Sequence, residues 1–329
     1  MKILKIFLAA IALTWSGLAL AWEPPKEVTV IVGFQPGSGN EIAFRKLAQL
    51  VNEKYPNTAF IVKHMAGADS VTSMNHFVTQ PNDGSVIAIP SHMGTYVTND
   101  VWQKSVKKFT QDDFISVLTM GKSPLVLVAS TKSKVNNTKE FVELIKNPDR
   151  PVFVAVGGGA HRTAYEYIMH KVGGNRELVK NVNFQGPQPA VESVSKFDGK
   201  DGTEFGIMPI AVANAMVEAG LVKPIGLTGT RLMPQMPKTP LLADVIPGVD
   251  VYAAWTLALP KDTNKEIVAW YQKAFGDAIK SLQYKEWTDK NIVFVEPNEL
   301  TPDGVAAQIA YLRNNFLPVL STLVNNEGK

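Results

Sequence analysis

The chain has 329 residues, 45% of them hydrophobic, with a formal charge of +3 and no cysteine. The lack of cysteine excludes disulfides, a lipid-bearing cysteine, a cysteine nucleophile and a thiolate metal site. A charge this close to neutral argues against nucleic acid as a partner, which requires a clear excess of basic side chains on one surface. The length exceeds what one hydrophobic core usually organises, so we expect two lobes.

Residues 1–21 have the order of a secretory signal peptide. Lys2 and Lys5 precede an apolar run, and the small-x-small pattern of a cleavage site follows as Ala19-Leu20-Ala21. A membrane anchor is the alternative, but a bilayer span needs about 20 near-continuous apolar residues. This segment is shorter and is interrupted by polar residues. We therefore expect export to the periplasm, with cleavage after Ala21.

The part of the chain after this segment alternates strands, loops and helices. A β-branched run leads into a glycine loop, after which apolar residues recur at helical spacing, and this order then repeats. The expected elements are strands at 28–32, 59–63 and 85–89 and helices over 41–54 and 70–79. Such strands with intervening helices predict a mostly parallel sheet. We assign residues 22–124 and 255–329 to lobe 1.

The same order restarts in a second α/β unit, assigned to lobe 2 as residues 125–254. Its expected elements are strands at 125–129, 152–156, 182–184, 204–208 and 225–228 and helices over 138–146, 162–172 and 210–219, with a further helix after Pro189. A strand at 251–259 then precedes two closing helices over 263–281 and 303–324. Thr263 and Glu266 have the spacing of a capping box at the start of the first closing helix.

No proline- or glycine-rich linker separates the two units. We therefore expect the chain to cross between lobes in strands, near Leu125 and again near Trp255. Two crossings make a hinge. Glycine loops at the carboxyl ends of strands would then face a shared cleft, which is where open α/β sheets bind ligands.

The loop at 36–41 lies between the end of a strand and the start of a helix. Free N–H groups and the helix dipole make such a place suited to an anion, and glycine lets the ligand approach the backbone. The loop lacks the lysine of a phosphate-binding loop and the third glycine of a dinucleotide site. Ser38 and Glu41 also have the spacing of a capping box, which needs no ligand. On spacing alone, the cap is the favoured interpretation.

A second glycine loop, residues 157–163, adds Arg162 at the start of a helix. Its guanidinium can hold a carboxylate through two parallel N–H bonds, although a surface arginine beside a turn is the simpler interpretation. His161 lies in the same loop, where ligand hydrogen bonding and plain exposure are both open. Trp255 could line the cleft or belong to the core.

Motifs for catalysis and metal binding are missing from the sequence. It contains neither Gly-x-Ser-x-Gly nor His-Glu-x-x-His, and its histidines lack metal-ligand spacing. We expect no enzymatic activity, no catalytic residue, no metal and no cofactor.

Taken in order, these motifs resemble the Bug, or TctC, family of periplasmic receptors that serve tripartite tricarboxylate transporters. The resemblance covers essentially the whole mature chain. The matching segments are 32–42 with Arg45, Leu47 and Ala48, then 66–68, 82–84, 113–114, 157–159, 184–186 with Pro189 and Ala190, 227–231 and Trp255.

The resemblance implies a Venus-flytrap α/β fold whose loops hold a ligand carboxylate, largely through backbone N–H groups and bridging water. The positions that carry over in lobe 1 are Phe34, Gly37, Ser38, Gly39, Asn40, Glu41, Gly67, Ala68, Ser91 and Met93, with Trp255 on the returning strand. Those in lobe 2 are Gly159, His161, Arg162, Thr163, Gly186 and Pro209.

The chain departs from the family at several of these positions. The family usually has aspartate in place of Glu41 and glycine in place of Ser38. It has a Gly-x-Gly-Gly pattern where Asp69 and Ser70 stand, and small hydroxyl residues where His161 and Arg162 stand.

We therefore expect a monomeric receptor that binds a small carboxylate-bearing metabolite and presents it to inner-membrane transporter subunits. The ligand would be a di- or tricarboxylate, an aromatic acid or an amino acid. The alternative is a periplasmic sensor subunit for a histidine kinase. A hydrolase or isomerase on the same scaffold is a third hypothesis, but the sequence supplies no paired nucleophile and base.

Overall fold

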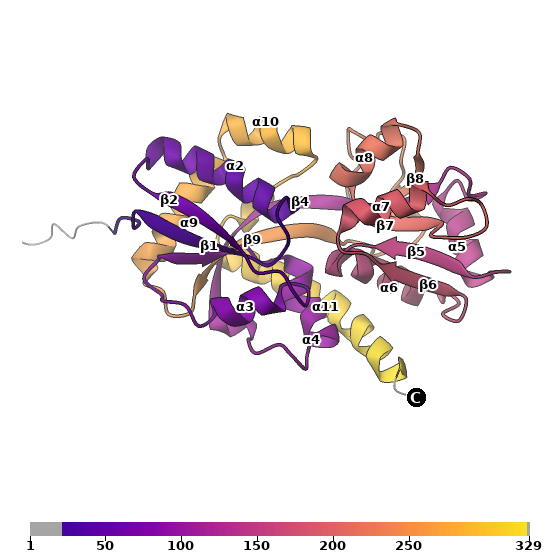
Figure 1. Ribbon diagram of the computed structural model, residues 1–329, viewed down its shortest axis with the longest axis horizontal. Helices are drawn as coiled ribbons and strands as arrows, with labels where there is room; N and C mark the ends of the chain where they lie inside the picture. Colours follow the sequence, from indigo (N-terminus) through magenta and orange to yellow (C-terminus); the bar gives the residue numbers. More distant parts are fainter. Residues whose placement is uncertain (1–21, 328–329) are drawn as a thin grey trace, which may run out of the picture.

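The computed structural model describes residues 22–327, and the expected signal peptide lies outside them. Figure 1 shows two α/β lobes joined by long strands. Among the described residues, no helix combines the length and apolar character needed to cross a membrane.

The lobe 1 sheet has the strand order β2-β1-β3-β9-β4. Its strands are β1 (Glu27–Val32), β2 (Ala59–His64), β3 (Val86–Ala88), β9 (Tyr252–Pro260) and the first part of β4 (Phe114–Ser130). Strand β1 pairs in parallel with β2 and β3, while β9 is antiparallel to β3 and β4. The carboxyl ends of β1, β2 and β3 therefore share one edge, where the predicted loops begin.

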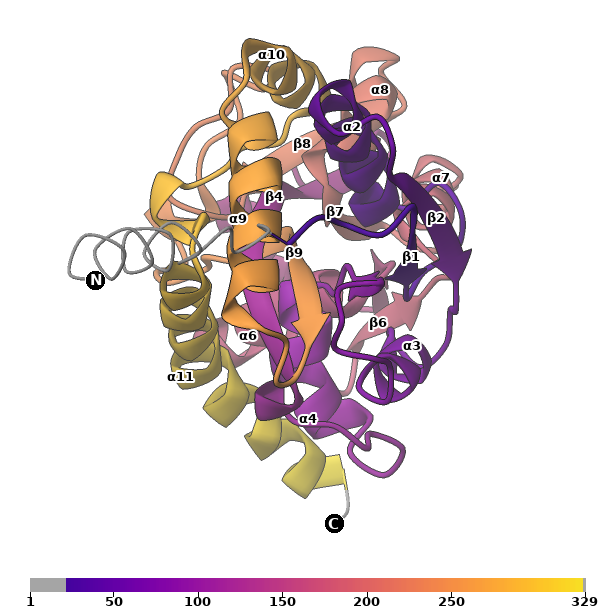
Figure 2. The ribbon, with the colours of Figure 1, turned by 90° about the vertical axis from the view of Figure 1, so that its left-hand side faces the viewer.

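Helices cover both faces of this sheet. One face carries α2 (Gly39–Lys54), α9 (Lys265–Ile279) and α10 (Leu282–Asn291). The other carries α3 (Val71–Phe77), a π-helical turn η1 (Gly94–Thr98), α4 (Asn99–Trp102) and part of α11 (Pro302–Glu327). Figure 2 shows α2 and α10 above the strands and α3 and α4 below. Phe44 and Leu47 of α2 are fully buried because their spacing puts them on the face that meets the sheet.

In lobe 2, β4 continues as the strand that pairs with β7 (Phe205–Pro209) and β8 (Val222–Leu227). Strand β5 (Val152–Val156) lies parallel to β7 and to β6 (Val179–Asn183). The helices are α5 (Thr138–Lys146), α6 (Gly159–Val172), α7 (Pro187–Ser195) and α8 (Ile210–Glu218). Short 3₁₀ turns are η2 (Gln111–Asp113), η3 (Leu242–Asp244) and η4 (Pro297–Glu299).

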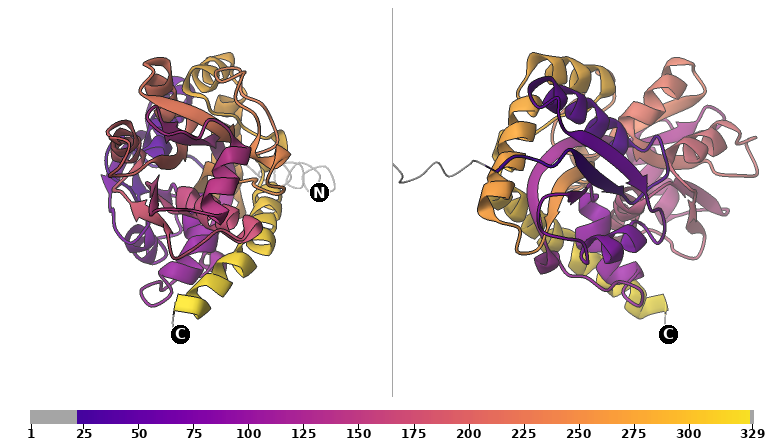
Figure 3. Two further views of the ribbon diagram at one scale, coloured as in Figure 1. Left: turned by 90° about the vertical axis from the view of Figure 1, so that its right-hand side faces the viewer. Right: turned by 60° about the vertical axis from the view of Figure 1, so that its left-hand side comes forward.

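Strand β4 belongs to both lobes. It pairs with β9 from Phe114 to Pro124 and with β7 and β8 from Leu125 onward. The predicted hinge of two crossing strands is confirmed. Helix α11 runs past this hinge from lobe 1 toward lobe 2 (Figure 1 and Figure 3), where Phe316 packs against Tyr167 of α6 with ring centroids 5.1 Å apart and ring planes tilted by 59°.

Two local predictions were wrong. Helix α10 was not expected because its residues are mostly polar, but buried Tyr284 and its stacking partner Trp287 dock it on the lobe 1 core. The capping box at Thr263 does not form because α9 begins at Lys265. The cap is Asn264, whose side chain accepts from the Glu266 N–H at 2.9 Å, while the Thr263 hydroxyl donates to the Pro260 carbonyl.

Candidate functional site

The loop between β1 and α2 is organised around the carboxylate of Glu41. The Gly37 N–H donates to Oε2 at 2.7 Å, and Arg45 Nε donates to Oε1 at 2.7 Å. Burial alone would raise the pKa of Glu41, but the bonds from Gly37 and Arg45 outweigh it and hold the pKa below its usual value. Glu41 is therefore ionised, and its carboxylate holds its own loop together through these bonds.

The capping box predicted for Ser38 and Glu41 is wrong. The Ser38 side chain caps no backbone group, and its buried Oγ has no hydrogen-bond partner among the described residues. Glu41 accepts from the N–H of Gly37, one residue earlier than a capping box requires. The Ser38 hydroxyl is left as a polar group for which the protein itself supplies no partner.

Trp255 brings two predicted positions together. Gly39 lies against its indole, where an added Cβ would be 2.8 Å from Cζ2, and Ser91 pairs with Trp255 through a β-bridge. Asn40 instead points into the sheet, donating to the Ile89 carbonyl at 3.1 Å. Met93 is 1% exposed and lies in the core. The three residues that lie together are Gly39, Ser91 and Trp255, which we call the first-lobe wall. The side chains of Asn40 and Met93 are instead buried in lobe 1.

The loop after β2 has an unusual backbone. Gly67, Ala68, Asp69 and Ser70 have φ values of 147°, 46°, 51° and 71°. Side-chain-bearing residues pay an energetic cost in this left-handed region. The Asp69 carbonyl is held by the Ser70 hydroxyl and by Asn99 Nδ2, which donates at 3.2 Å. This conformation directs the Asp69 side chain toward Gly159 at the start of α6 in lobe 2.

The carboxyl group of Asp69 meets the start of helix α6. The Gly159 N–H donates to it, and the Thr98 hydroxyl donates to Oδ2 at 3.2 Å. The contact is so close that a Cβ on Gly159 would overlap Oδ2. Burial raises the pKa of Asp69 even though these bonds and the nearby Arg162 oppose the shift. Asp69 was not among the predicted site residues; the one signal for it was an acidic residue at a glycine position of the family.

His161 and Thr163 serve their own loop. Nδ1 of His161 accepts from the Gly157 N–H at 3.2 Å, and the Thr163 hydroxyl donates to the Gly159 carbonyl at 2.8 Å. Burial lowers the pKa of His161 to about 4, so its ring is neutral at pH 7 with the proton on Nε2. These two side chains stabilise the loop through hydrogen bonds to its own backbone.

Arg162 connects the lobes. Its guanidinium lies 4.0 Å from the ring centroid of Trp102, in α4 of lobe 1, and its Nε is 3.9 Å from Glu166 Oε1. Glu166 is also paired with Arg176. Arg162 is thus fixed beside Asp69 by stacking and charge, rather than extended into solvent.

The remaining predicted positions are backbone features. The Phe34 carbonyl lies 3.0 Å from His64 Nδ1. Gly186 packs against Gly157 so closely that a Cβ added to Gly157 would overlap the Gly186 carbonyl oxygen. Pro209 ends β7 opposite Leu125 of the hinge strand.

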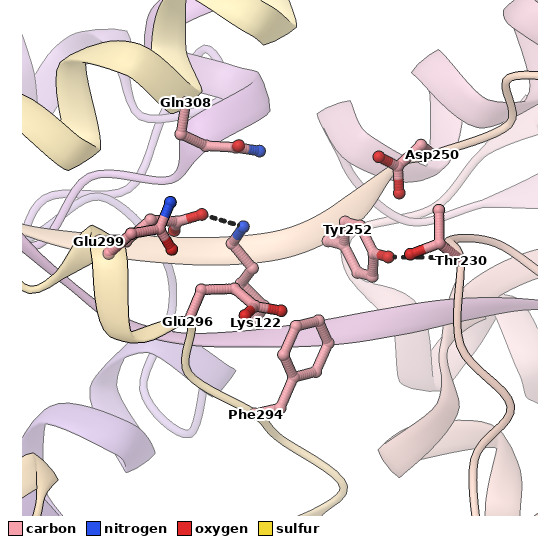
Figure 4. Close-up of a pocket in the computed structure, with 9 residues that line it drawn as sticks. Lys122, Thr230, Asp250, Tyr252, Phe294, Glu296, Glu299 and Gln308 are labelled. Carbon is pink, nitrogen blue, oxygen red and sulfur yellow. Dashed lines mark hydrogen bonds and ion pairs between the residues drawn. The ribbon is translucent and has the colours of Figure 1, made fainter.

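A polar cavity of about 260 Å³ lies at the hinge (Figure 4). It is lined by Lys122, Thr230, Asp250, Tyr252, Phe294, Glu296, Asn298, Glu299 and Gln308, none of which was predicted. Lys122 on β4 is paired with Glu299 on η4, and both side chains are almost fully buried. Burial, and secondarily Lys122, lowers the pKa of the nearby His92 to about 3.

Within residues 22–327, no group of three or more histidine, aspartate or glutamate side chains could hold a metal ion.

Comparisons with known proteins agree with this architecture. The periplasmic binding protein BugD superposes with a TM-score of 0.77 at 18% identity, covering 93% of this chain and 99% of its own. MatC of Rhodopseudomonas palustris, with bound malate, gives 0.78 at 18% identity, covering 90% and 99%. An adipate-bound R. palustris protein gives 0.80 at 18% identity, covering 91% and 98%. At this identity the likeness establishes the fold.

No curated protein matches the chain by sequence. The model of the tripartite tricarboxylate transporter family receptor, TctC, matches residues 29–302. That match spans most of the chain, ends at the start of α11 and includes both β4 and β9. The chain therefore belongs to the TctC family of periplasmic solute-binding receptors.

Proposed function

We propose that the mature protein captures a small carboxylate-bearing metabolite between its lobes in the periplasm and delivers it to a tripartite tricarboxylate-type membrane transporter. It acts as a receptor rather than an enzyme, and as a monomer. The lobes rotate about β4 and β9, and the closed form is the one presented to the transporter. Lobe 1 comprises residues 22–124 with 255–329, and lobe 2 comprises residues 125–254.

The observation that carries this proposal is the carboxyl group of Asp69 at the start of α6. The Gly159 N–H and the Thr98 hydroxyl both donate to it. A helix start that holds a carboxylate from the opposite lobe has the donors and the dipole that a ligand carboxylate needs. Two structural neighbours, captured with malate and with adipate, bind ligands of the same class.

We place the ligand against the first-lobe wall, beside Gly39 and Trp255. The unpartnered Ser38 hydroxyl offers it a hydrogen bond, and the Trp255 indole offers it an apolar surface beside Gly39. The other predicted site residues shape these loops. Arg162 contributes a positive charge near the second-lobe end.

Isothermal titration of refolded, ligand-stripped mature protein against mono-, di- and tricarboxylates and aromatic acids tests the proposal. We expect at least one acid to bind. Gly39→Ala should weaken that binding at least tenfold, because its Cβ would displace the Trp255 ring. Gly276→Ala in α9 is the matched control, since an added Cβ there contacts nothing within 4 Å. No binding across the panel, or preference for uncharged sugars, contradicts the carboxylate assignment.

Delivery is tested separately in cells. Deleting the gene should abolish uptake of the radiolabelled ligand, and a plasmid copy should restore it. Unimpaired uptake in the deletion strain, together with loss of a transcriptional response to the ligand, would favour a sensor subunit for a histidine kinase instead.

A further inference from the structure

We propose that Asp69 is the residue that sets ligand class: its carboxylate takes the place that a second ligand carboxylate would occupy, and so restricts the receptor to monocarboxylates. This inference rests on the proposed function, because it concerns the lobe 2 end of the same cleft. It separates this chain from receptors that clamp a ligand by a carboxylate at each end.

The first step is geometric. The Asp69 Oδ2 atom accepts from the Thr98 hydroxyl at 3.2 Å and sits where a Cβ on Gly159 would overlap it. An oxygen in van der Waals contact with the first residue of α6 leaves no room for another carboxylate at the same N–H group. Any ligand carboxylate directed at this helix start must displace Asp69.

The second step concerns charge. The helix start and Arg162 together provide the positive field near this point, and the Asp69 carboxylate already draws on both. A second ligand carboxylate at this point would find the Thr98 hydroxyl and the Gly159 N–H already occupied by Asp69, and a charge placed there without hydrogen-bond partners is costly. A ligand with an uncharged lobe 2 end meets no such cost.

The third step is that the fold holds Asp69 there at a cost. Three successive side-chain-bearing residues, Ala68, Asp69 and Ser70, adopt left-handed φ values. Such strain persists only where surrounding bonds maintain it. Here the Asn99 amide donates to the Asp69 carbonyl at 3.2 Å and fixes the backbone, while the Thr98 hydroxyl holds the side-chain Oδ2.

Matched ligand pairs test the inference. Butanoate and succinate, hexanoate and adipate, and benzoate and terephthalate each differ by one carboxylate, and titration calorimetry gives their dissociation constants. For the wild type, the monocarboxylate of the preferred pair should bind at least tenfold more tightly. Asp69→Gly, which vacates the helix start, should improve dicarboxylate binding at least tenfold.

Ala68→Gly is the matched control. It places glycine at the preceding left-handed position, relieving the same kind of backbone strain while leaving the Asp69 carboxyl group and its hydrogen bonds in place. An equal gain in dicarboxylate affinity for this variant would assign the effect to the backbone and overturn the inference. Wild-type dicarboxylate binding as tight as that of Asp69→Gly would also overturn it and leave the proposed function intact. No carboxylate binding by any of the three proteins would overturn the proposed function, and this inference with it.

Discussion

The buried ion pair between Lys122 and Glu299 should be the most sensitive electrostatic contact at the hinge. Their side chains are 5% and 2% exposed, and Glu299 Oε2 has no hydrogen-bond partner among the described residues. Removing the lysine leaves a buried carboxylate without its countercharge, which costs about 3–5 kcal/mol in such pairs. We therefore expect Lys122→Met to lower the free energy of unfolding by that amount.

The double substitution separates charge from packing. Lys122→Met combined with Glu299→Met removes both charges, and the free energy of unfolding should return to within about 1 kcal/mol of wild type because the desolvation cost disappears with them. Lys285→Met is the control: Lys285 and Asp289 form an ion pair that is about two-thirds exposed on both sides, which contributes at most about 1 kcal/mol.

Urea unfolding followed by far-ultraviolet circular dichroism measures all four proteins. Equal denaturant slopes would show that the unfolded states are comparable. A loss below about 1 kcal/mol for Lys122→Met would refute the reasoning, since it would mean that water entering the adjoining cavity solvates Glu299. A double variant no more stable than the single one would refute it equally.

Two further predictions concern helix α6 and its neighbours. His161→Asn keeps an oxygen near Nδ1 to accept from the Gly157 N–H but removes the titration. The pKa of His161 lies at about 4 when folded and 6.5 when unfolded, so the wild type loses stability as the pH drops from 6.5 to 4. In urea unfolding, the stability lost between pH 7 and pH 4 should be about 3 kcal/mol smaller for His161→Asn than for the wild type. An unchanged fall would contradict this. Phe316→Ala should cost about 3–5 kcal/mol in the same assay because the ring is 1% exposed, whereas exposed Asn314→Ala should change little; equal effects would refute the α11 packing.

The fold could be predicted because it depends on local patterns. The apolar spacing in α2 and the β-branched run in β1 each indicate an element without reference to the rest of the chain. The hinge followed from the lack of a linker between two such units. Helix α10 could not be predicted because its docking depends on two aromatic residues, Tyr284 and Trp287, in an otherwise mostly polar segment.

The site could be predicted only in outline. Its loops were located, since glycines between a strand and a helix have a defined meaning, but the directions of the side chains were not. His161 turns to its own backbone, and Lys122 pairs with a residue 177 positions away. Such contacts depend on tertiary packing that neither spacing nor composition encodes.

Glu41 and Asp69 show why similar carboxylates at helix starts have different consequences. Glu41 binds Gly37 and Arg45 within its own loop, so its charge is neutralised locally and its pKa falls. Asp69 contacts Gly159 of the other lobe, where burial outweighs its hydrogen bonds and its pKa rises. In the proposed rotation of the lobes, a carboxyl group that costs energy to bury and joins both lobes would contribute to the balance between open and closed forms. The group that we propose narrows the choice of ligand would therefore also affect how readily the lobes part.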